Sequence, residues 1–421
     1  MIGNPGRRAL GRGVCWLAAA GSAMMISAAV RASERPTNPH EVKAKLQKYE
    51  SDYYTIFTDL DIEVVREAAA RLRAMAEEYN RRTKGFAGTM TKKFPFYLFS
   101  NSPDYYAAGG PKDSSGVYTG GSLMAAAPKG SPNDRVWHVV QHEGFHQFAH
   151  VVISSRLPVW VSEGLAEYFG EGVWTGDGIV TGVMPSSKLD RVQKSIKENQ
   201  VLPFQEMVGI NQKDWNDKVG TPDGTRNYEQ AWAMVHFLVH AEDGKYRKEF
   251  SGFMVDVSRG KSARQAFADR FGGDMQAFEK RYRDWWASMG ENPTADAYTQ
   301  ATVATLTSFL ARGTAMGLKF QNAEDFFAAA KDGKLDVDPK KNPRLTYLWL
   351  PPSLLTKTLP KAGALSEWSL QLPEKGTPKL LLKQAGGKTF TGTFALPPGK
   401  SPEVSVTMEA PKPATLPAAQ P

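Results

Sequence analysis

The segment His142-Glu143-Gly144-Phe145-His146 constrains this chain more than any other part of its sequence, because it matches the zinc motif H-E-x-x-H. Residues four apart on a helix lie on one face, so both imidazoles can reach one Zn²⁺ at about 2.0–2.1 Å. Glu143 is rotated away from the ligand position and lies near enough to exchange a proton with a water molecule. The motif predicts His142 and His146 as ligands and Glu143 as general base.

The motif has the flanking signals of a helix. Ser131 can cap its start, Pro132 suits the first helical position, and Asp134 follows three residues after the cap. The predicted helix runs to about Ser154, and Pro158 lies shortly after its end.

Glu163 is the candidate third ligand. A second helix is predicted to begin between Pro158 and Ser162 and to stop at Gly170 or Gly172, which leaves room for a turn and an antiparallel return. Two histidines and one glutamate leave a fourth position open, as in catalytic zinc sites. Glu167, one turn later, could accept a hydrogen bond from the free ring nitrogen of a ligand histidine. The alternative is that both glutamates form the solvated face of an amphipathic helix.

Four histidines follow one another at spacing four: His138, His142, His146 and His150. Only the middle pair has glutamate at the second position. The stripe rotates by about 40° per step, so we interpret His138 and His150 as packing or hydrogen-bonding residues.

Tyr228 and His236 belong to a mostly apolar helical segment that is predicted over 228–240. One interpretation is a buried aromatic ring and a buried histidine of the core. The other is that one of them donates a hydrogen bond to the oxyanion that forms when water attacks a carbonyl. Tyr228 is the candidate, because a helix start can face a cleft.

The region before the motif predicts a small mixed sheet. Residues 53–57 and 94–99 are rich in β-branched and aromatic side chains, 62–79 has a helical pattern, and a third strand is predicted near Val117 and Tyr118. After the motif, helical patterns cover 246–257, 263–271 and 275–289. The predicted class is therefore α+β.

The chain of 421 residues is too long for one ordinary core, so several domains are expected. The predicted parts are a signal peptide (1–32), a catalytic domain (44–290), a helical connector (291–340), a small β-rich domain (341–410) and a disordered tail (411–421). The β-rich assignment depends on short alternating runs at 345–350, 368–372, 390–396 and 404–408.

The N-terminus resembles an export signal. Three arginines within 7–12 precede an apolar run over 14–30, and Val30-Arg31-Ala32 offers a cleavage site. The alternative is an uncleaved membrane anchor. No later stretch predicts a membrane span, so no stable insertion is expected after cleavage.

Net charge and cysteine content argue against a nucleic-acid-binding protein and against a metal site with cysteine ligands. The formal charge is +8, and the signal holds four Arg and no acid, so the mature chain carries 8 − 4 = +4, which is no nucleic-acid footprint. The only cysteine is Cys15, so a metal site in the mature chain must use His, Asp and Glu.

Three segments carry a resemblance to the gluzincin metallopeptidases, closest to the exported bacterial peptidase-MA-like proteins: 142–150, 157–169 and 228–238. In that family, the glutamate of W-x-x-E-G-x-A-E is the third zinc ligand, which is Glu163 here. The resemblance covers about 50–290 and implies a zincin-like fold, with a twisted sheet beside the two site helices. The G-x-M-E-N segment of gluzincin aminopeptidases is absent from the sequence, so aminopeptidase activity is not implied.

These observations together predict an exported zinc metallopeptidase with one Zn²⁺ per chain and a peptide or protein substrate. Two other classes stay open: a binding or assembly protein that keeps the zinc fold without turnover, and a zinc hydrolase of a non-peptide substrate. An intact Glu143 argues against the first, because a structural zinc site needs no base.

Overall fold

The computed structural model describes residues 38–410 apart from positions 113, 129, 131, 154 and 155. The predicted signal (1–32) and tail (411–421) therefore lie outside the described residues. The chain forms two compact units. Among the described residues, the first consists of 38–65, 79–171 and 184–291, and the second of 66–78, 172–183 and 292–410.

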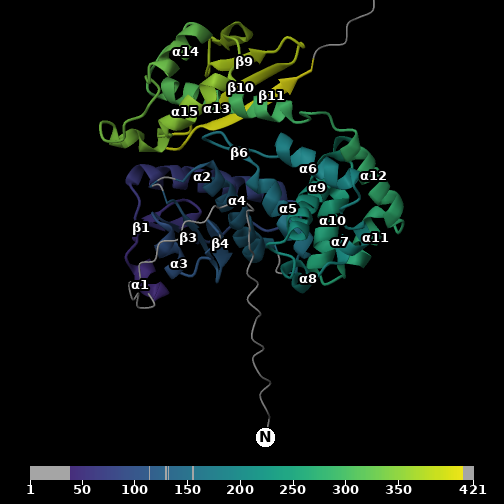
Figure 1. Ribbon diagram of the computed structural model, residues 1–421. Helices are drawn as coiled ribbons and strands as arrows, with labels where there is room; N and C mark the ends of the chain where they lie inside the picture. The colour runs from purple at the N-terminus through teal and green to yellow at the C-terminus, as the bar shows by residue number, and fades with distance from the viewer. Residues whose placement is uncertain (1–37, 113, 129, 131, 154–155, 411–421) are drawn as a thin grey trace, which may run out of the picture. The chain divides into compact units, whose positions relative to one another are not determined.

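The first unit contains a five-stranded mixed sheet in the order β1-β2-β3-β5-β4 (Figure 1). Its strands are β1 (Gln47–Glu50), β2 (Tyr54–Thr58), β3 (Phe94–Phe99), β4 (Gly116–Thr119) and β5 (Ser122–Ala126). β2, β3 and β5 run parallel, while β1 and β4 pair antiparallel at the two edges. The predicted mixed sheet and the α+β class are confirmed.

Residue type explains which strands were predicted. Tyr54, Ile56 and Thr58 of β2 are buried in alternation, as in a strand with one covered face. β1 and β5 were missed because the first is polar and the second, Ser-Leu-Met-Ala-Ala, has low β-propensity at its alanines.

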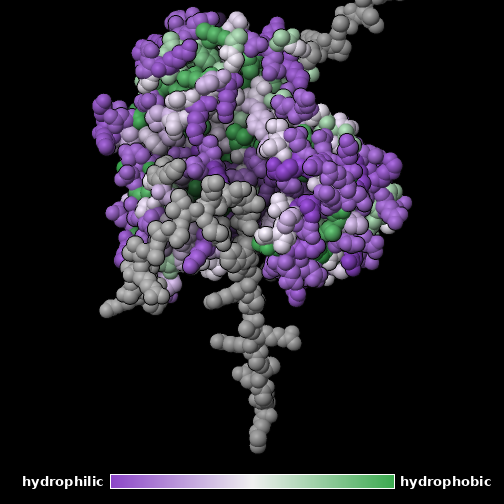
Figure 2. Space-filling model, viewed as in Figure 1, coloured by the Kyte–Doolittle hydropathy of each residue, from purple (hydrophilic) through white to green (hydrophobic). Residues whose placement is uncertain are grey.

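Helices make up the rest of the first unit. They are α1 (Pro39–Ala44), α3 (Ser102–Ala107), α4 (Asp134–Phe148), α5 (Val159–Gly170), α6 (Ser186–Lys197), α7 (Phe204–Gly209), α8 (Gln212–Asn216), α9 (Pro222–Gly244), α10 (Arg247–Ser258), α11 (Ala263–Phe271) and α12 (Met275–Ala287). α2 (Ile62–Thr83) supplies residues to both units. Among these helices, α12 buries only Phe278, Tyr282 and Trp286, one face at spacing four. Figure 2 shows mainly hydrophilic residues over α11 and α12.

Two predicted helix boundaries are wrong. α4 is capped by Asn133, whose side chain accepts a hydrogen bond from the Val136 N–H, and the predicted cap Ser131 lies outside the described residues. After Phe148 the helix continues as a π-helical turn over Ala149–Ile153. α9 begins at Pro222 with Thr221 as its cap, six residues before the predicted start at Tyr228.

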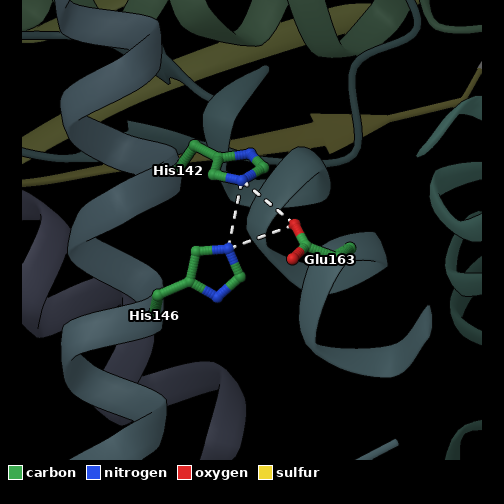
Figure 3. A group of neighbouring side chains, drawn as sticks. All are labelled: His142, His146 and Glu163. Carbon is green, nitrogen blue, oxygen red and sulfur yellow. Dashed lines mark hydrogen bonds and ion pairs between the residues drawn. The ribbon is translucent and has the colours of Figure 1, made fainter. Parts of the chain in front are cut away.

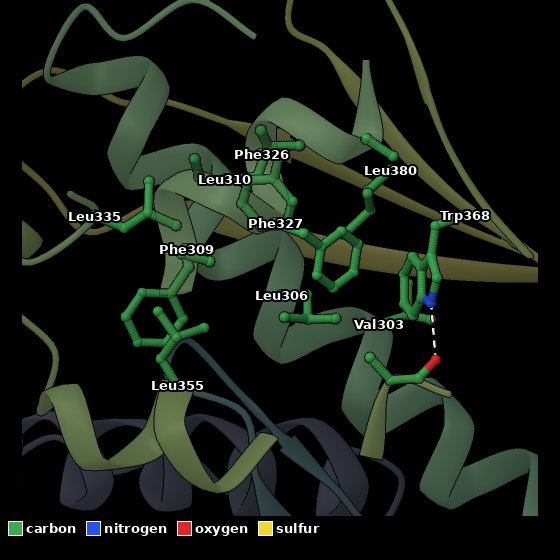
Figure 4. Close-up of a cluster of buried hydrophobic side chains, with 14 of the residues drawn as sticks. Val303, Leu306, Phe309, Leu310, Phe326, Phe327, Leu335, Leu355, Trp368 and Leu380 are labelled. Carbon is green, nitrogen blue, oxygen red and sulfur yellow. Dashed lines mark hydrogen bonds between the residues drawn. The ribbon is translucent and has the colours of Figure 1, made fainter. Parts of the chain in front are cut away.

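The second unit has its own core. Its antiparallel sheet has the order β11-β10-β9-β8, from β8 (Trp368–Gln371), β9 (Lys379–Lys383), β10 (Thr389–Ala395) and β11 (Glu403–Glu409). Helices α13 (Ala295–Ala315), α14 (Ala323–Lys331) and α15 (Pro352–Thr358) pack with this sheet in one hydrophobic cluster (Figure 4). The predicted small β-rich C-terminal module is confirmed, and all strands of its sheet pair antiparallel. The run 345–350, expected as a strand, is mostly a 3₁₀ helix (Pro343–Leu348).

A buried ion pair links α13 to the hairpin of β6 (Val173–Trp174) and β7 (Ile179–Val180) within this unit. The Arg312 guanidinium donates to both Asp177 carboxylate oxygens, at 2.6 and 2.9 Å, and both side chains are 1% exposed. Arg312 also donates to the carbonyls of Leu348 and Ser308. The guanidinium is thereby satisfied despite its burial.

Candidate metal centre

Helix α4 presents His142 and His146 on one buried face (Figure 3). Their Nε2 atoms lie 3.1 Å apart. The other ring nitrogen of His146, Nδ1, lies 3.1 Å from Ser162 Oγ on α5. Both imidazoles therefore turn the same nitrogen, Nε2, toward one point.

Helix α5 brings Glu163 to that point. Its Oε2 lies 3.2 Å from His146 Nε2 and 3.4 Å from His142 Nε2. The three residues are buried, and one donor atom from each lies within 4.8 Å of the others, so the group could hold a metal ion. Gly164 allows this position, because a Cβ there would come within 2.4 Å of the Ala231 carbonyl oxygen on α9.

Two buried glutamines hold α4 in place. The Gln147 amide donates to the carbonyls of Pro95 and Gly121, which fixes the helix against the sheet. The Gln141 amide donates to carbonyls at the end of α5, including that of Phe169 at 3.0 Å. Because both helices are tied by side chain–backbone bonds, the donor atoms are preorganised.

Glu143 lies on the same helix and is fully buried. Its Oε2 accepts a 2.8 Å hydrogen bond from the backbone N–H of Tyr118 on β4. Gly116 lets β4 approach, since a Cβ there would meet Val139 Cγ1 at 2.6 Å. Glu143 Oε1 has no hydrogen-bond partner among the described residues. Burial, only partly opposed by the two histidines, raises the pKa of this carboxyl.

Burial disfavours the charged forms of His142 and Glu163, but the attraction between the histidines and the nearby carboxylates outweighs this effect. The carboxylates of Glu163 and Glu167 raise the pKa of His142 to about 10. The two histidines in turn lower the pKa of Glu163 to about 2. Without a cation, His142 is therefore protonated at neutral pH, and a metal ion would have to displace that proton.

Glu167 lies on the other side of the His142 ring. Its Oε1 is 3.2 Å from His142 Nδ1, close to the partner that the sequence suggested, although this nitrogen has no hydrogen-bond partner of good geometry among the described residues. Its Oε2 is 2.5 Å from Lys188 Nζ on α6, and the same ammonium lies 2.8 Å from Glu171 Oε1. Burial would raise the pKa of Glu167, but Lys188 and His142 hold it well below its usual range.

A second group that could hold a metal ion consists of His138, Glu167 and Glu171. The sequence predicted only a packing or hydrogen-bonding role for His138, whose Nδ1 lies 3.9 Å from Glu171 Oε2. The Lys188 ammonium already contacts both carboxylates of this group. His150 is exposed, and its ring centroid lies 6.0 Å from that of Tyr118.

Tyr228 lies within α9 rather than at its start, so the reason for choosing it from the sequence no longer holds. Its ring packs edge-on against Trp215, with centroids 5.0 Å apart. Tyr228 lines a pocket of about 340 Å³ together with Glu167 and Lys188. The structure thus groups Tyr228 with residues on the Nδ1 side of His142.

His236 has the surroundings of a core histidine. It is fully buried, and its ring lies 4.4 Å from that of Trp232. Neither ring nitrogen has a hydrogen-bond partner in the part of the chain that the structure describes. Burial lowers its pKa well below the usual range, so the ring is neutral.

Residues 137–263 match the family described as "Protein of unknown function (DUF1570)". The matched region contains the donor group of His142, His146 and Glu163 as well as Lys188. Comparison with curated proteins and with solved structures finds no significant match. In addition, none of the helices within the described residues is long and apolar enough to span a membrane.

Three partners of the centre were missed from the sequence: the Tyr118 N–H, Ser162 and Lys188. The Tyr118 donor is a backbone N–H, which does not depend on the residue type and so cannot be recognised in the sequence. Ser162 directly precedes Glu163 in the quoted W-V-S-E-G segment, so it could have been considered as a partner of His146. Lys188 has no periodic relation to the motif and was not detectable.

Proposed function

We propose that this chain is a zinc-dependent peptide hydrolase that acts outside the cytoplasm. The observation that carries the proposal is the arrangement of Glu143 beside the three donor atoms. One carboxylate oxygen is fixed by the Tyr118 N–H, and the other has no partner among the described residues. A buried carboxylate with a free oxygen and a raised pKa is suited to act as a general base.

The donor set and its spacing support zinc. Two imidazole nitrogens and one carboxylate oxygen are typical of catalytic zinc sites. Ligand atoms at about 2.0–2.1 Å from a tetrahedral ion lie about 3.3–3.4 Å apart. The separations here are 3.1, 3.2 and 3.4 Å.

Bound Zn²⁺ would polarise a carbonyl and lower the pKa of water at the site. The residues of the chain would do the rest. Glu143 would take a proton from the attacking water and deliver it to the leaving amine. Glu167 would hold His142 in the tautomer with its proton on Nδ1. The oxyanion donor that the sequence suggested, Tyr228, lines the pocket on the Nδ1 side of His142, so the proposal does not depend on it.

Two features of the sequence support the location and the substrate class. The signal-like segment 1–32 supports export, and the resemblance to the gluzincins supports a peptide substrate. The binding-protein alternative is disfavoured by the buried, preorganised Glu143, which a purely structural site would not need.

The test is a metal analysis of the purified mature protein together with digestion of a broad peptide library. We expect about one zinc per chain and cleavage that a chelator abolishes and added Zn²⁺ restores. If the protein held one zinc per chain but cleaved no peptide, ester or amide, it would belong to the binding-protein class instead. Absence of bound zinc would refute the proposal.

A further inference from the structure

The side of His142 that faces away from the donor atoms carries a second arrangement of charges. Glu167 shares its two carboxylate oxygens between two partners: Oε1 faces His142 Nδ1 at 3.2 Å, and Oε2 faces Lys188 Nζ at 2.5 Å. The Glu167 carboxylate therefore connects His142 with Lys188. The Lys188 side chain is 8% exposed and the Glu167 side chain 7%.

The position of Lys188 is set by three helices. α6 buries it on the same face as Leu189 and Val192. α5 supplies Glu171, whose Oε1 lies 2.8 Å from the ammonium. α9 supplies the Trp232 ring, whose centroid lies 4.8 Å from Nζ, within the range of a cation–π contact. The ammonium is thus held at one point and does not move freely as a surface lysine does.

Charge balance gives Lys188 a specific task when a metal ion is bound. A histidine that holds a metal ion through Nε2 carries its proton on Nδ1, and the atom opposite that nitrogen is Glu167 Oε1, at 3.2 Å. The Glu167 side chain is 7% exposed, and a buried carboxylate without a counter-charge is costly. Lys188 supplies the counter-charge on the oxygen that His142 does not use.

We propose that Lys188 is a positioning residue of the candidate metal centre, which holds the Glu167 carboxylate in place so that Glu167 orients the His142 ring for metal binding. This inference rests on the proposed metal site, and it adds a residue from outside the motif and the helices α4 and α5. Lys188 acts on the metal only through Glu167. Loss of such an outer partner typically lowers metal affinity by about 10–100-fold.

The experiment measures zinc affinity by competition with a chelator in the full mature protein. Lys188→Met should lower the affinity about 10–100-fold, while Lys194→Met, an exposed lysine on the same helix, should leave it unchanged. Lys188→Arg, which keeps the charge, should restore most of the affinity. The visible spectrum of the Co²⁺-loaded protein should shift in Lys188→Met, because the orientation of His142 changes.

A double variant isolates the route through Glu167. Lys188→Met combined with Glu167→Gln removes both partners, leaves no unpaired charge between them, and should fold even if Lys188→Met alone does not. Its zinc affinity should equal that of Glu167→Gln alone, because the two residues act as one unit. Additive losses, or an unchanged affinity and Co²⁺ spectrum in Lys188→Met, would overturn the inference. A wild-type protein that binds no metal would instead refute the proposed function.

Discussion

The backbone N–H of Tyr118, on an edge strand, donates a 2.8 Å hydrogen bond to Glu143, on the helix of the candidate metal centre. The bond fixes one carboxylate oxygen and thereby sets the direction of the other. It depends on Gly116, which lets β4 approach α4 closely. If Glu143 acts as the proposed general base, it must be held in place while it exchanges a proton, and this bond would provide that restraint.

Glu143→Gln should separate metal binding from hydrolysis. The amide keeps the size of the side chain and can still accept the Tyr118 bond, but it cannot take a proton. We expect unchanged zinc content and a peptidase rate lower by about 10²–10⁴-fold. Glu163→Ala is the contrasting variant, because loss of a donor atom should lower both zinc affinity and rate. An unchanged rate in Glu143→Gln would place the activity at another site.

Zinc affinity should rise with pH. Because the pKa of His142 in the metal-free protein is raised to about 10, above its ordinary 6.5, a metal ion displaces a proton at all lower pH values. We expect the logarithm of the apparent affinity to increase by about one per pH unit between pH 6 and 9. Calorimetry in buffers of different ionisation enthalpy should detect the released proton. Affinity that is independent of pH would show that His142 is already neutral.

The raised pKa of His142 should also make the stability of the metal-free protein depend on pH. A raised pKa in the folded state contributes stability that is fully present below the unfolded value of 6.5 and is lost as pH rises through about 10. The pH dependence of unfolding in the presence of chelator measures this contribution. His142→Gln is the control, in which this part of the dependence should disappear.

Tyr228→Phe tests the oxyanion role that the sequence suggested for Tyr228. The substitution keeps the ring against Trp215 and removes only the hydroxyl. If the hydroxyl stabilises the oxyanion, kcat should fall by about 10²–10³-fold with zinc content unchanged. A kcat equal to that of the wild type would exclude this role and leave Tyr228 as a pocket-lining residue.

Asp177→Asn should destabilise the second unit. It leaves the Arg312 guanidinium buried without its counter-charge, which typically costs about 3–5 kcal/mol. Urea denaturation should measure the loss. The control is Asp217→Asn, which breaks the exposed Lys213–Asp217 pair and should leave the midpoint unchanged. Equal midpoints for both variants would contradict the structural role of the buried pair.

Residue spacing within single helices and strands was sufficient to predict part of the candidate metal centre. The spacing of four between His142 and His146 places both on one helical face in any fold that keeps the helix. The same holds for Glu163 and Glu167, and the β-branched and aromatic residues of 53–57 predicted a strand. Each of these patterns depends only on the geometry of a single element.

The tertiary structure decided the rest. Glu163 reaches the histidines because Gly164 admits α9, and Glu143 is fixed by the backbone of Tyr118. Lys188 joins the centre although 21 residues separate it from Glu167 along the chain. Contacts between separate elements have no period in the sequence, because they depend on how helices and strands pack. The sequence therefore determined which donor atoms share a face, and packing determined which charges surround them.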